Sequence, residues 1–278
     1  MFPQIAPRPD DAPGQMAEMG IDAARTALNI AGTNPADVDL VICAASNHER
    51  AYPAVAIEIQ QLLGTGGFAF DMNVACSSAT FGLQAAADMI KSGSVSKALV
   101  ICPEICSAHL EWRDRDCHFI FGDVATALVL EADATSGFRI DSTRCATEFS
   151  NNIRNNNWFL RRAHDQMEDR RDMQLMQNGR KVFKEVLPLV SAHIKAHMAD
   201  EGVQAYDLKR LWLHQANKKM NDFIGKKVLG RTPDPSEQPN ILQDYANTSS
   251  AGSIIAFSKH SSDTVSYTHL TLPTILLV

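Results

Sequence analysis

The chain lacks several features that define other classes of protein. None of its apolar runs reaches the length of a membrane-spanning helix, and Met1 is not followed by the basic and then apolar leader of a secreted protein. Positive charge is not in excess, since the formal net charge of −6 argues against broad nucleic-acid binding. The six cysteines lie mostly within apolar runs, which favours free thiols in a reduced, cytoplasmic setting over a disulfide framework.

The chain does contain enough apolar sequence for a substantial core. Of its 278 residues, 45% are hydrophobic and 21% are charged, which fits one large domain or two modest ones. Apolar runs typical of buried strands cover residues 40–45, 68–74, 98–102 and 125–130. Helical patterns cover residues 16–31, 55–63 and 77–92. This alternation predicts an α/β architecture with strands buried on both faces.

The second half of the chain has a similar organisation. Helical patterns cover residues 179–199 and 218–228, and the apolar run 210–213 is predicted to be a strand. Residues 35–47 align without gaps on residues 205–217, with an aspartate, an apolar run and a terminal asparagine at matching positions. The alignment suggests two duplicated α/β halves, and chance similarity between two strand–loop patterns is the alternative.

The most informative motif is Ala-Cys76-Ser, within residues 70–82. The pattern predicts a strand that stops at Cys76, followed at once by a helix of small residues over 77–92. Because unpaired N–H groups and the helix dipole favour negative charge there, we expect a lowered pKa for the Cys76 thiol and a nucleophilic thiolate. A buried free cysteine that acts as a small hydrophobe is the alternative.

Two later motifs place polar side chains at similar junctions. His214-Gln-Ala-Asn217 puts a histidine where an apolar run stops, and Asn247-Thr-Ser puts an asparagine before another helix of small residues. Side chains at the ends of three strand-to-helix junctions are predicted to converge on one site. The alternatives are a strand-end histidine with satisfied bonds and an asparagine that serves only as a helix N-cap.

With these three motifs in this order, the chain resembles the thiolase-like condensing enzymes, and most closely β-ketoacyl-[acyl carrier protein] synthase III, over roughly residues 12–259. The resemblance implies a thiolase-like fold of two duplicated α/β halves, with layered sheets and buried central helices. It implies an N-terminal half at 1–140 that carries Cys76 and an incomplete C-terminal half at 141–263 that carries His214 and Asn247. An atypical tail follows at 264–278. The resemblance also implies a homodimer.

The same resemblance implies an acyltransferase reaction that starts fatty-acid or polyketide chains. An acyl-CoA primer would condense with malonyl-acyl carrier protein, with loss of carbon dioxide, through an acyl group carried on Cys76. His214 and Asn247 would donate hydrogen bonds to the enolate oxygen. Coenzyme A and phosphopantetheine thioesters are substrates, and no metal or cofactor is expected. A non-decarboxylating acyltransferase or thiolase and an inactive truncated fragment are the alternatives, although the second reactive cysteine of thiolases has no counterpart after Cys145.

Further positions match substrate-binding residues of the family. Arg115 matches an arginine near the coenzyme A nucleotide, and Tyr52 matches an aromatic residue that crosses the dimer interface toward the acyl pocket. The predicted helix after His214 carries the basic residues that dock the acidic carrier protein in the family, namely Lys218, Lys219, Lys226 and Lys227. A solvated helix face is the alternative for these lysines.

Other segments depart from the family or from known motifs. The opening strand of the family and its coenzyme A-binding segment are not found before Met16, and the tail has neither a charged residue after Asp263 nor a glycine. We interpret the tail as unrelated, non-native sequence, with an edge strand broken by Pro273 as the alternative. The polar segment 147–172 is expected at the surface, with residues 158–160 as an alternative tunnel lining. The cysteines at 102, 106 and 117 are spaced too irregularly for a zinc site.

Overall fold

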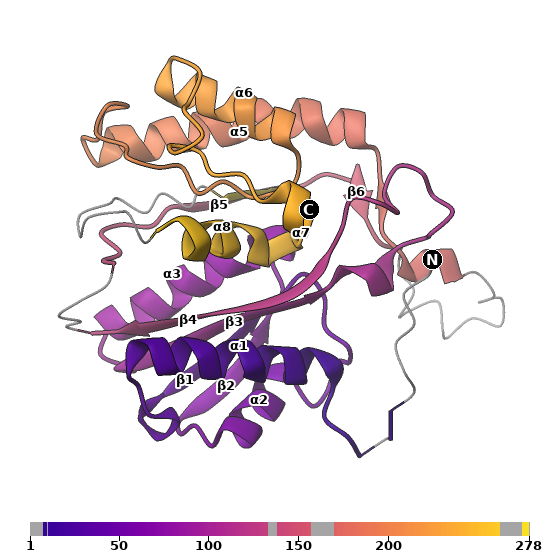
Figure 1. The fold of residues 1–278 in the computed structure, drawn as a ribbon, viewed down its shortest axis with the longest axis vertical. Helices are drawn as coiled ribbons and strands as arrows, with labels where there is room; N and C mark the ends of the chain where they lie inside the picture. Colours follow the sequence, from indigo (N-terminus) through magenta and orange to yellow (C-terminus); the bar gives the residue numbers. More distant parts are fainter. Residues whose placement is uncertain (1–7, 10, 133–137, 157–169, 262–273, 278) are drawn as a thin grey trace.

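A four-stranded mixed sheet forms the centre of the N-terminal half. The structure is a computed structural model that describes residues 8–9, 11–132, 138–156, 170–261 and 274–277 (Figure 1). The strand order is β2-β1-β3-β4. β1 (Leu40–Ala44) pairs in parallel with β2 (Phe68–Met72) and β3 (Lys97–Ile105), and β4 (Asp123–Glu131) runs antiparallel to β3. All four predicted strands of this half are present. β1 and β3 are buried as predicted, whereas β2 and β4, at the edges of the described sheet, are only partly buried.

Alternate residues of β1 point into two different cores. Leu40 and Ile42 pack with α3 (Ser78–Lys91) and α8 (Gly252–His260), whereas Val41 and Cys43 pack with α1 (Gln15–Ala31) and α2 (Val55–Leu63). A strand turns successive side chains to opposite faces of its sheet, so a continuously apolar run is what a strand covered on both faces requires. The two pairs of helices lie on opposite faces of the sheet (Figure 1).

A third core lies on the far side of α3 and α8. α5 (Gly179–Asp200) and α6 (Lys218–Leu229) pack on one another and on the buried side chains of Leu208, Leu211 and Leu213. In Figure 1 these two helices form the upper layer, so α3 and α8 lie between two layers of structure. The predicted layered α/β fold with central helices is confirmed.

Short elements connect the layers. β5 (Cys145–Glu148) pairs in parallel with β8 (Thr274–Leu277), and β6 (Ile153–Arg154) pairs antiparallel with β7 (Met176–Gln177). The remaining elements are single turns: η1 (Pro35–Asp37), η2 (Ala75–Ser77), η3 (Cys106–His109), η4 (Arg170–Met173), α7 (Leu242–Tyr245) and η5 (Ser249–Ala251). β8 lies at the end of the tail, and the interpretation of the tail as unrelated sequence stays a prediction. The tunnel-lining hypothesis for residues 158–160 falls outside the described residues.

The predicted strand at residues 210–213 is wrong. These residues are buried, but in the described chain they belong to no ladder, and their backbone is held by a bond from Leu211 N to Glu237 O (2.8 Å). The apolar pattern correctly indicated burial, and burial alone does not provide a pairing partner. The two aligned segments both begin with the same turn, closed by Asp37 N to Asn34 O and by Asp207 N to Gln204 O. Duplication and the boundaries 1–140, 141–263 and 264–278 stay predictions.

No helix in the described ranges has the length and apolar character needed to cross a membrane.

Candidate active site

Cys76 lies in a strained turn after the edge strand β2. β2 ends at Met72, and Cys76 occupies the turn η2 that leads into α3. Ala75, directly before it, has a φ of 44°, a left-handed conformation that costs an alanine on the order of 1–3 kcal/mol. The Ser78 hydroxyl fixes the turn, because it accepts from Val74 N (2.8 Å) and lies within bonding distance of the carbonyl oxygens of Ala75 and Ala45.

Asn247 is held by a backbone bridge to the loop before β4. Asn247 N donates to Ile120 O (2.8 Å), and Gly122 N donates to Asn247 O (3.0 Å). The close approach of Gly122 to the backbone of Tyr245 requires glycine, since a Cβ on Gly122 would lie 2.4 Å from Tyr245 O. Ala246, directly before Asn247, has a φ of 57°. A residue with a positive φ thus precedes Asn247, as Ala75 precedes Cys76.

His214 is fixed through its neighbour Gln215. The Gln215 side chain is fully buried, and its amide donates to Leu213 O (2.9 Å) and accepts from Ile241 N (3.2 Å). The Gln215 amide thus bonds the carbonyl directly before His214 and the N–H of Ile241 in a separate segment, as burial of polar groups requires. The buried amide of Gln215 therefore helps to fix the segment that carries the ring of His214.

The three predicted side chains meet around Ser249. The Ser249 hydroxyl donates to Cys76 Sγ (3.3 Å), and Ser249 N donates to Asn247 Oδ1 (3.0 Å). The backbone of Ser249 lies close enough to His214 to act on the pKa of its ring. Because Oδ1 of Asn247 is engaged, its NH₂ group is the end left for a substrate. The predicted convergence of Cys76, His214 and Asn247 is therefore present in the structure.

Burial controls the charges at this site. It raises the pKa of the Cys76 thiol to about 11, with Glu104 adding to the rise and the Ser249 hydrogen bond opposing it. The expected lowering of this pKa by the helix N-terminus is wrong, because removing the thiolate from water costs more than the local donors return. Burial also lowers the pKa of His214 to about 4, against a smaller opposing effect of the nearby Ser249 backbone. A neutral thiol and a neutral imidazole therefore face the site at pH 7.

The sequence analysis missed two residues of this site. Ser249 is the third residue of the motif Asn247-Thr-Ser, in which the sequence analysis assigns a role only to the asparagine. Glu104 is fully buried in β3, where its carboxylate is bound by Ser46 and Ser250. A glutamate inside an otherwise apolar strand was the available signal, since a buried carboxylate requires partners.

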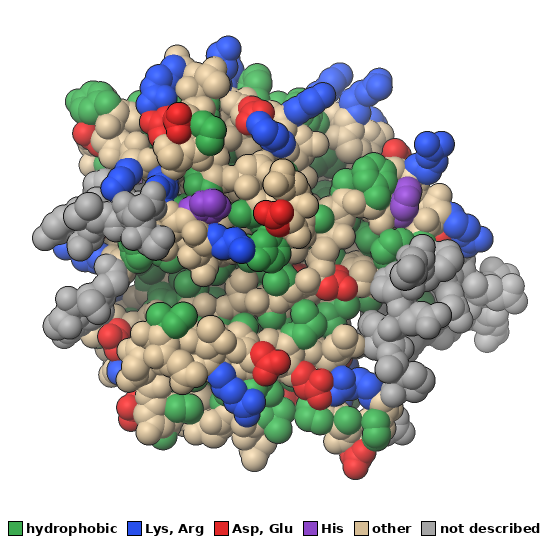
Figure 2. Space-filling view, in the orientation of Figure 1, with side chains coloured by type: hydrophobic (Ala, Val, Ile, Leu, Met, Phe, Trp, Pro, Cys, Tyr) green, Lys and Arg blue, Asp and Glu red, His purple; other side chains and the backbone are tan. Residues whose placement is uncertain are grey.

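The other predicted residues lie on the surface and away from these contacts. Arg115 is exposed, and the Tyr52 side chain is 85% exposed. Within the described chain, neither forms a hydrogen bond with Cys76, His214 or Asn247. The four lysines are exposed on α6, where Lys218 pairs with Asp222 (2.9 Å) and Lys227 lies over the ring of Phe223 (5.5 Å). Figure 2 shows basic side chains projecting along the edge of the molecule that α5 and α6 form.

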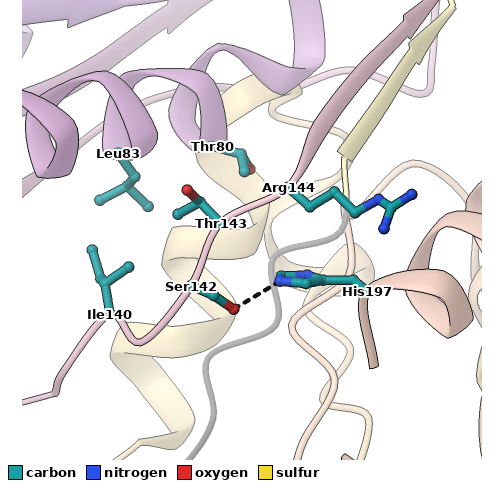
Figure 3. Close-up of a pocket in the computed structure, with 7 residues that line it drawn as sticks. All are labelled: Thr80, Leu83, Ile140, Ser142, Thr143, Arg144 and His197. Carbon is teal, nitrogen blue, oxygen red and sulfur yellow. Dashed lines mark hydrogen bonds between the residues drawn. The ribbon is translucent and has the colours of Figure 1, made fainter. Parts of the chain in front are cut away.

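A small cavity lies between α3 and the segment that leads into β5 (Figure 3). Its volume is about 30 Å³, and Ser142 Oγ lies 2.8 Å from His197 Nε2 at its edge. Such a volume holds a water molecule or two and no acyl chain. The lining residues are Thr80, Leu83, Ile140, Ser142, Thr143, Arg144 and His197.

One group of side chains among the described residues has the composition of a metal site. Ligand atoms of Cys43, His48 and Asp71 lie within 4.8 Å of one another. Both oxygens of Asp71 already accept bonds from the first N–H groups of α2, at Val55 and Ala56. The carboxylate therefore caps a helix in this structure.

Comparison with known proteins identifies the family. Residues 70–148 match the family model for 3-oxoacyl-[acyl-carrier-protein] synthase III, and residues 198–268 match the model for its C-terminal part. The chain is 51% identical over 267 residues to a beta-ketodecanoyl-[acyl-carrier-protein] synthase of Pseudomonas aeruginosa, covering 95% of this chain and 76% of that protein. The chain belongs to the β-ketoacyl-[acyl-carrier-protein] synthase III family.

Further relatives agree with this assignment. A beta-ketoacyl-[acyl-carrier-protein] synthase III of Acidiphilium cryptum is 36% identical over 244 residues, covering 87% of this chain and 73% of the relative. The crystal structure of 3-oxoacyl-[acyl-carrier-protein] synthase III from Aquifex aeolicus superposes with a TM-score of 0.79 at 27% identity, covering 89% of this chain and 76% of the other. This synthase III chain is therefore an acyltransferase of fatty-acid synthesis, which condenses an acyl-CoA primer with malonyl-acyl carrier protein.

Proposed function

We propose that Cys76 carries the acyl group in this condensation and that His214 and Asn247 stabilise the enolate. The observation that supports these roles is the placement of all three around Ser249. Its hydroxyl donates to the sulfur of Cys76, its N–H donates to Asn247, and its backbone lies beside His214. A nucleophile and hydrogen-bond donors in one small volume are what acyl transfer followed by enolate formation requires.

In the first half-reaction, the sulfur of Cys76 attacks the thioester carbonyl of the acyl-CoA primer. A bond forms between Sγ and the acyl carbon, the bond to the sulfur of coenzyme A breaks, and the thiol proton leaves on coenzyme A. Because the pKa of the Cys76 thiol is about 11, the enzyme rests as a thiol, and the proton must move as the new bond forms. The Ser249 hydroxyl stabilises negative charge on Sγ during this step.

In the second half-reaction, malonyl-acyl carrier protein loses carbon dioxide and leaves an enolate. Its carbon attacks the acyl group, and the thiolate of Cys76 is released and takes up a proton. The negative oxygen of the enolate accepts hydrogen bonds from His214 and from the NH₂ group of Asn247. A neutral imidazole donates from one ring nitrogen, which fits the lowered pKa of His214. Each step uses side chains of this chain and the two thioesters, so the proposal includes no cofactor or metal.

The name of one relative supports a primer of eight carbons. The Pseudomonas aeruginosa relative is named for a β-ketodecanoyl product, which has ten carbons, and decarboxylating condensation adds two. We infer that octanoyl-CoA is a primer for this chain. Arg115 is proposed to contact the nucleotide of the coenzyme A thioester.

Two surfaces support proposals about macromolecular partners. The exposed lysines of α6 form a basic face next to His214, and we propose that Lys219, Lys226 and Lys227 dock the acidic carrier protein. Lys218 contributes less, because Asp222 neutralises it. Phe68 is exposed on β2, an edge strand of the described sheet, and Tyr52 is exposed in the loop before α2, which supports a homodimer formed along that edge. Catalysis by a free thiol supports a cytoplasmic location.

The catalytic proposal is tested with radiolabelled octanoyl-CoA and malonyl-acyl carrier protein. We expect label on Cys76 in the wild-type protein and none in Cys76→Ala. Cys145→Ala is the matched control, because burial raises the pKa of that free thiol to about 11 as well. Equal label in Cys76→Ala and wild-type protein would contradict the proposal.

The roles of His214 and Asn247 are tested by separating the two half-reactions. His214→Ala and Asn247→Ala should keep the acyl label on Cys76 but release carbon dioxide from malonyl-acyl carrier protein about 100-fold more slowly or worse. Decarboxylation at the wild-type rate in both variants would remove the two side chains from the mechanism.

Docking is tested by charge reversal on α6. Lys226→Glu should raise KM for malonyl-acyl carrier protein about tenfold and leave KM for octanoyl-CoA unchanged, because the carrier protein alone contacts this face. Lys91→Glu, an exposed lysine at the end of α3, is the matched control. An equal rise in KM in both variants would indicate a general effect of net charge.

A further inference from the structure

Glu104 is a fully buried carboxylate that the condensation does not use. It lies on β3 and is 0% exposed. Its Oε1 accepts bonds from Ser46 N (2.9 Å), Ser250 N (3.2 Å) and the Ser250 hydroxyl, and its Oε2 accepts from the Ser46 hydroxyl (2.6 Å). The N–H groups of Ser46 and Ser250 can only donate, so Oε1 acts as an acceptor, and the two hydroxyls can donate as well.

This anion does not activate the nucleophile. Its negative charge raises the pKa of the Cys76 thiol, so it disfavours the thiolate. Burial raises the pKa of Glu104 itself, and the bonds from Ser250 and Ser46 oppose that rise. Burying a carboxylate costs free energy unless hydrogen bonds compensate for the lost water. We therefore ask which parts of the structure the bonds of Glu104 connect.

The bonds of Glu104 join two segments that are far apart in the sequence. Ser46 follows the carboxyl end of β1, and Ser250 is the middle residue of η5. Ser249, the preceding residue of η5, is the one whose hydroxyl reaches Cys76. Ser249 has a φ of 50°, a conformation that persists only where the surroundings enforce it.

We propose that Glu104 is a positioning residue that holds η5 against the end of β1 and so places the Ser249 hydroxyl on the sulfur of Cys76. The inference rests on the proposed function, since it assigns to Glu104 the geometry on which that site depends. It predicts that loss of the carboxylate acts on Cys76 through Ser249.

The experiment compares Glu104→Gln with Glu104→Ala, each in the wild-type and in the Ser249→Ala background. Both variants remove the negative charge. Glutamine keeps an oxygen for the Ser46 and Ser250 donors, and the Ser46 hydroxyl can rotate to accept from its NH₂, whereas alanine leaves these groups unpaired. The measurement is the pH dependence of iodoacetamide alkylation at Cys76, followed by peptide mass spectrometry. Thermal melting selects variants that fold.

We expect the apparent pKa of Cys76 in Glu104→Gln to fall below that of the wild-type protein, because the anion is gone. In Glu104→Ala it should be about one unit higher than in Glu104→Gln, a tenfold loss of thiolate, because the Ser249 bond is lost as well. In the Ser249→Ala background this difference should disappear. If Glu104→Ala does not fold, Ser250→Ala replaces it and is compared with the wild-type protein, because both keep the carboxylate; the apparent pKa of Cys76 should then be about one unit higher in the variant.

Two outcomes would overturn the proposal: equal pKa values in folded Glu104→Gln and Glu104→Ala, or a difference that persists undiminished without the Ser249 hydroxyl. Alkylation requires neither substrate, so this result is independent of whether Cys76 carries the acyl group. Failure of the proposed function would appear instead in the acyl-labelling experiment.

Discussion

Cys76 follows the half-buried strand β2 and His214 follows a buried apolar run, and the two segments are held in place differently. The strands before Cys76 form a ladder in which β1 pairs on both sides, with β2 and with β3. The segment before His214 has no ladder in the described chain and depends on the amide of Gln215 and on one backbone bond to Glu237. The difference teaches that the same apolar pattern can be fixed by many equivalent backbone bonds or by a few particular side chains. Substitutions on the His214 and Asn247 side should therefore lower the free energy of unfolding more than substitutions on the Cys76 side.

The largest effect is expected at the bridge that holds Asn247. In Gly122→Ala the new Cβ would meet Tyr245 O at 2.4 Å, a backbone atom that cannot move alone. We expect a loss of about 3 kcal/mol in the free energy of unfolding, measured by urea denaturation. Gly82→Ala, in α3 on the Cys76 side, meets only side chains at 3.0 Å or more and gains helix propensity, so it should change by less than about 1 kcal/mol. Equal losses of unfolding free energy in the two variants would contradict the expected difference between the two sides.

The next effect tests Gln215 directly. Gln215→Ala removes the buried amide and leaves Leu213 O and Ile241 N without this partner. We expect a loss of about 2 kcal/mol by urea denaturation, with a matching fall in condensation rate. Gln60→Ala also removes a bond to a backbone carbonyl, that of Gly66, but at an exposed site, and should cost about 0.5 kcal/mol. A Gln215→Ala protein as stable as the wild type would contradict the role of this amide.

The pH dependence of stability should also reveal a contribution from the His214 side. His214 has a folded-state pKa of about 4, below its unfolded value of 6.5, so the unfolded chain binds more protons between these values. Its contribution to stability is present above pH 6.5 and is lost as the pH falls toward 4, by about 2 kcal/mol at pH 5. His214→Gln should reduce the loss between pH 7.5 and pH 5 by this amount. An unchanged pH profile in the variant would assign the acid sensitivity to other groups.

The smallest effect concerns helix caps. Asn217 Oδ1 accepts from Lys219 N and Met220 N at the start of α6, whereas Asn34 accepts from Ala36 N at the short turn η1. We expect Asn217→Ala to cost about 1 kcal/mol and Asn34→Ala a few tenths, measured as shifts in the urea midpoint. The reverse order would show that the C-terminal side is the more tolerant one.

Much of the fold follows from local sequence patterns. The strands at β1, β2, β3 and β4 and the helices α1, α2, α3, α5 and α6 lie where apolar periodicity predicts them, because that periodicity reflects the faces that each element buries. The three motif residues could be proposed because their neighbours are distinctive. The partner residues could not, since Ser249 and Cys76 are 173 positions apart and Glu104 and Ser250 are 146 apart. The rise in the pKa of Cys76 depends on burial by the whole fold, which a local motif does not reveal.

The carboxyl end of β1 has a consequence for how the site responds to thermal motion. Ala45 O lies 3.0 Å from the Ser78 hydroxyl beside Cys76, and Ala44 O lies 3.2 Å from the Ser250 hydroxyl beside Asn247. A shift of this strand end would therefore move the turn that carries Cys76 and the turn that follows Asn247 together. The spacing between these two turns is set at the end of one strand rather than by the outer helices.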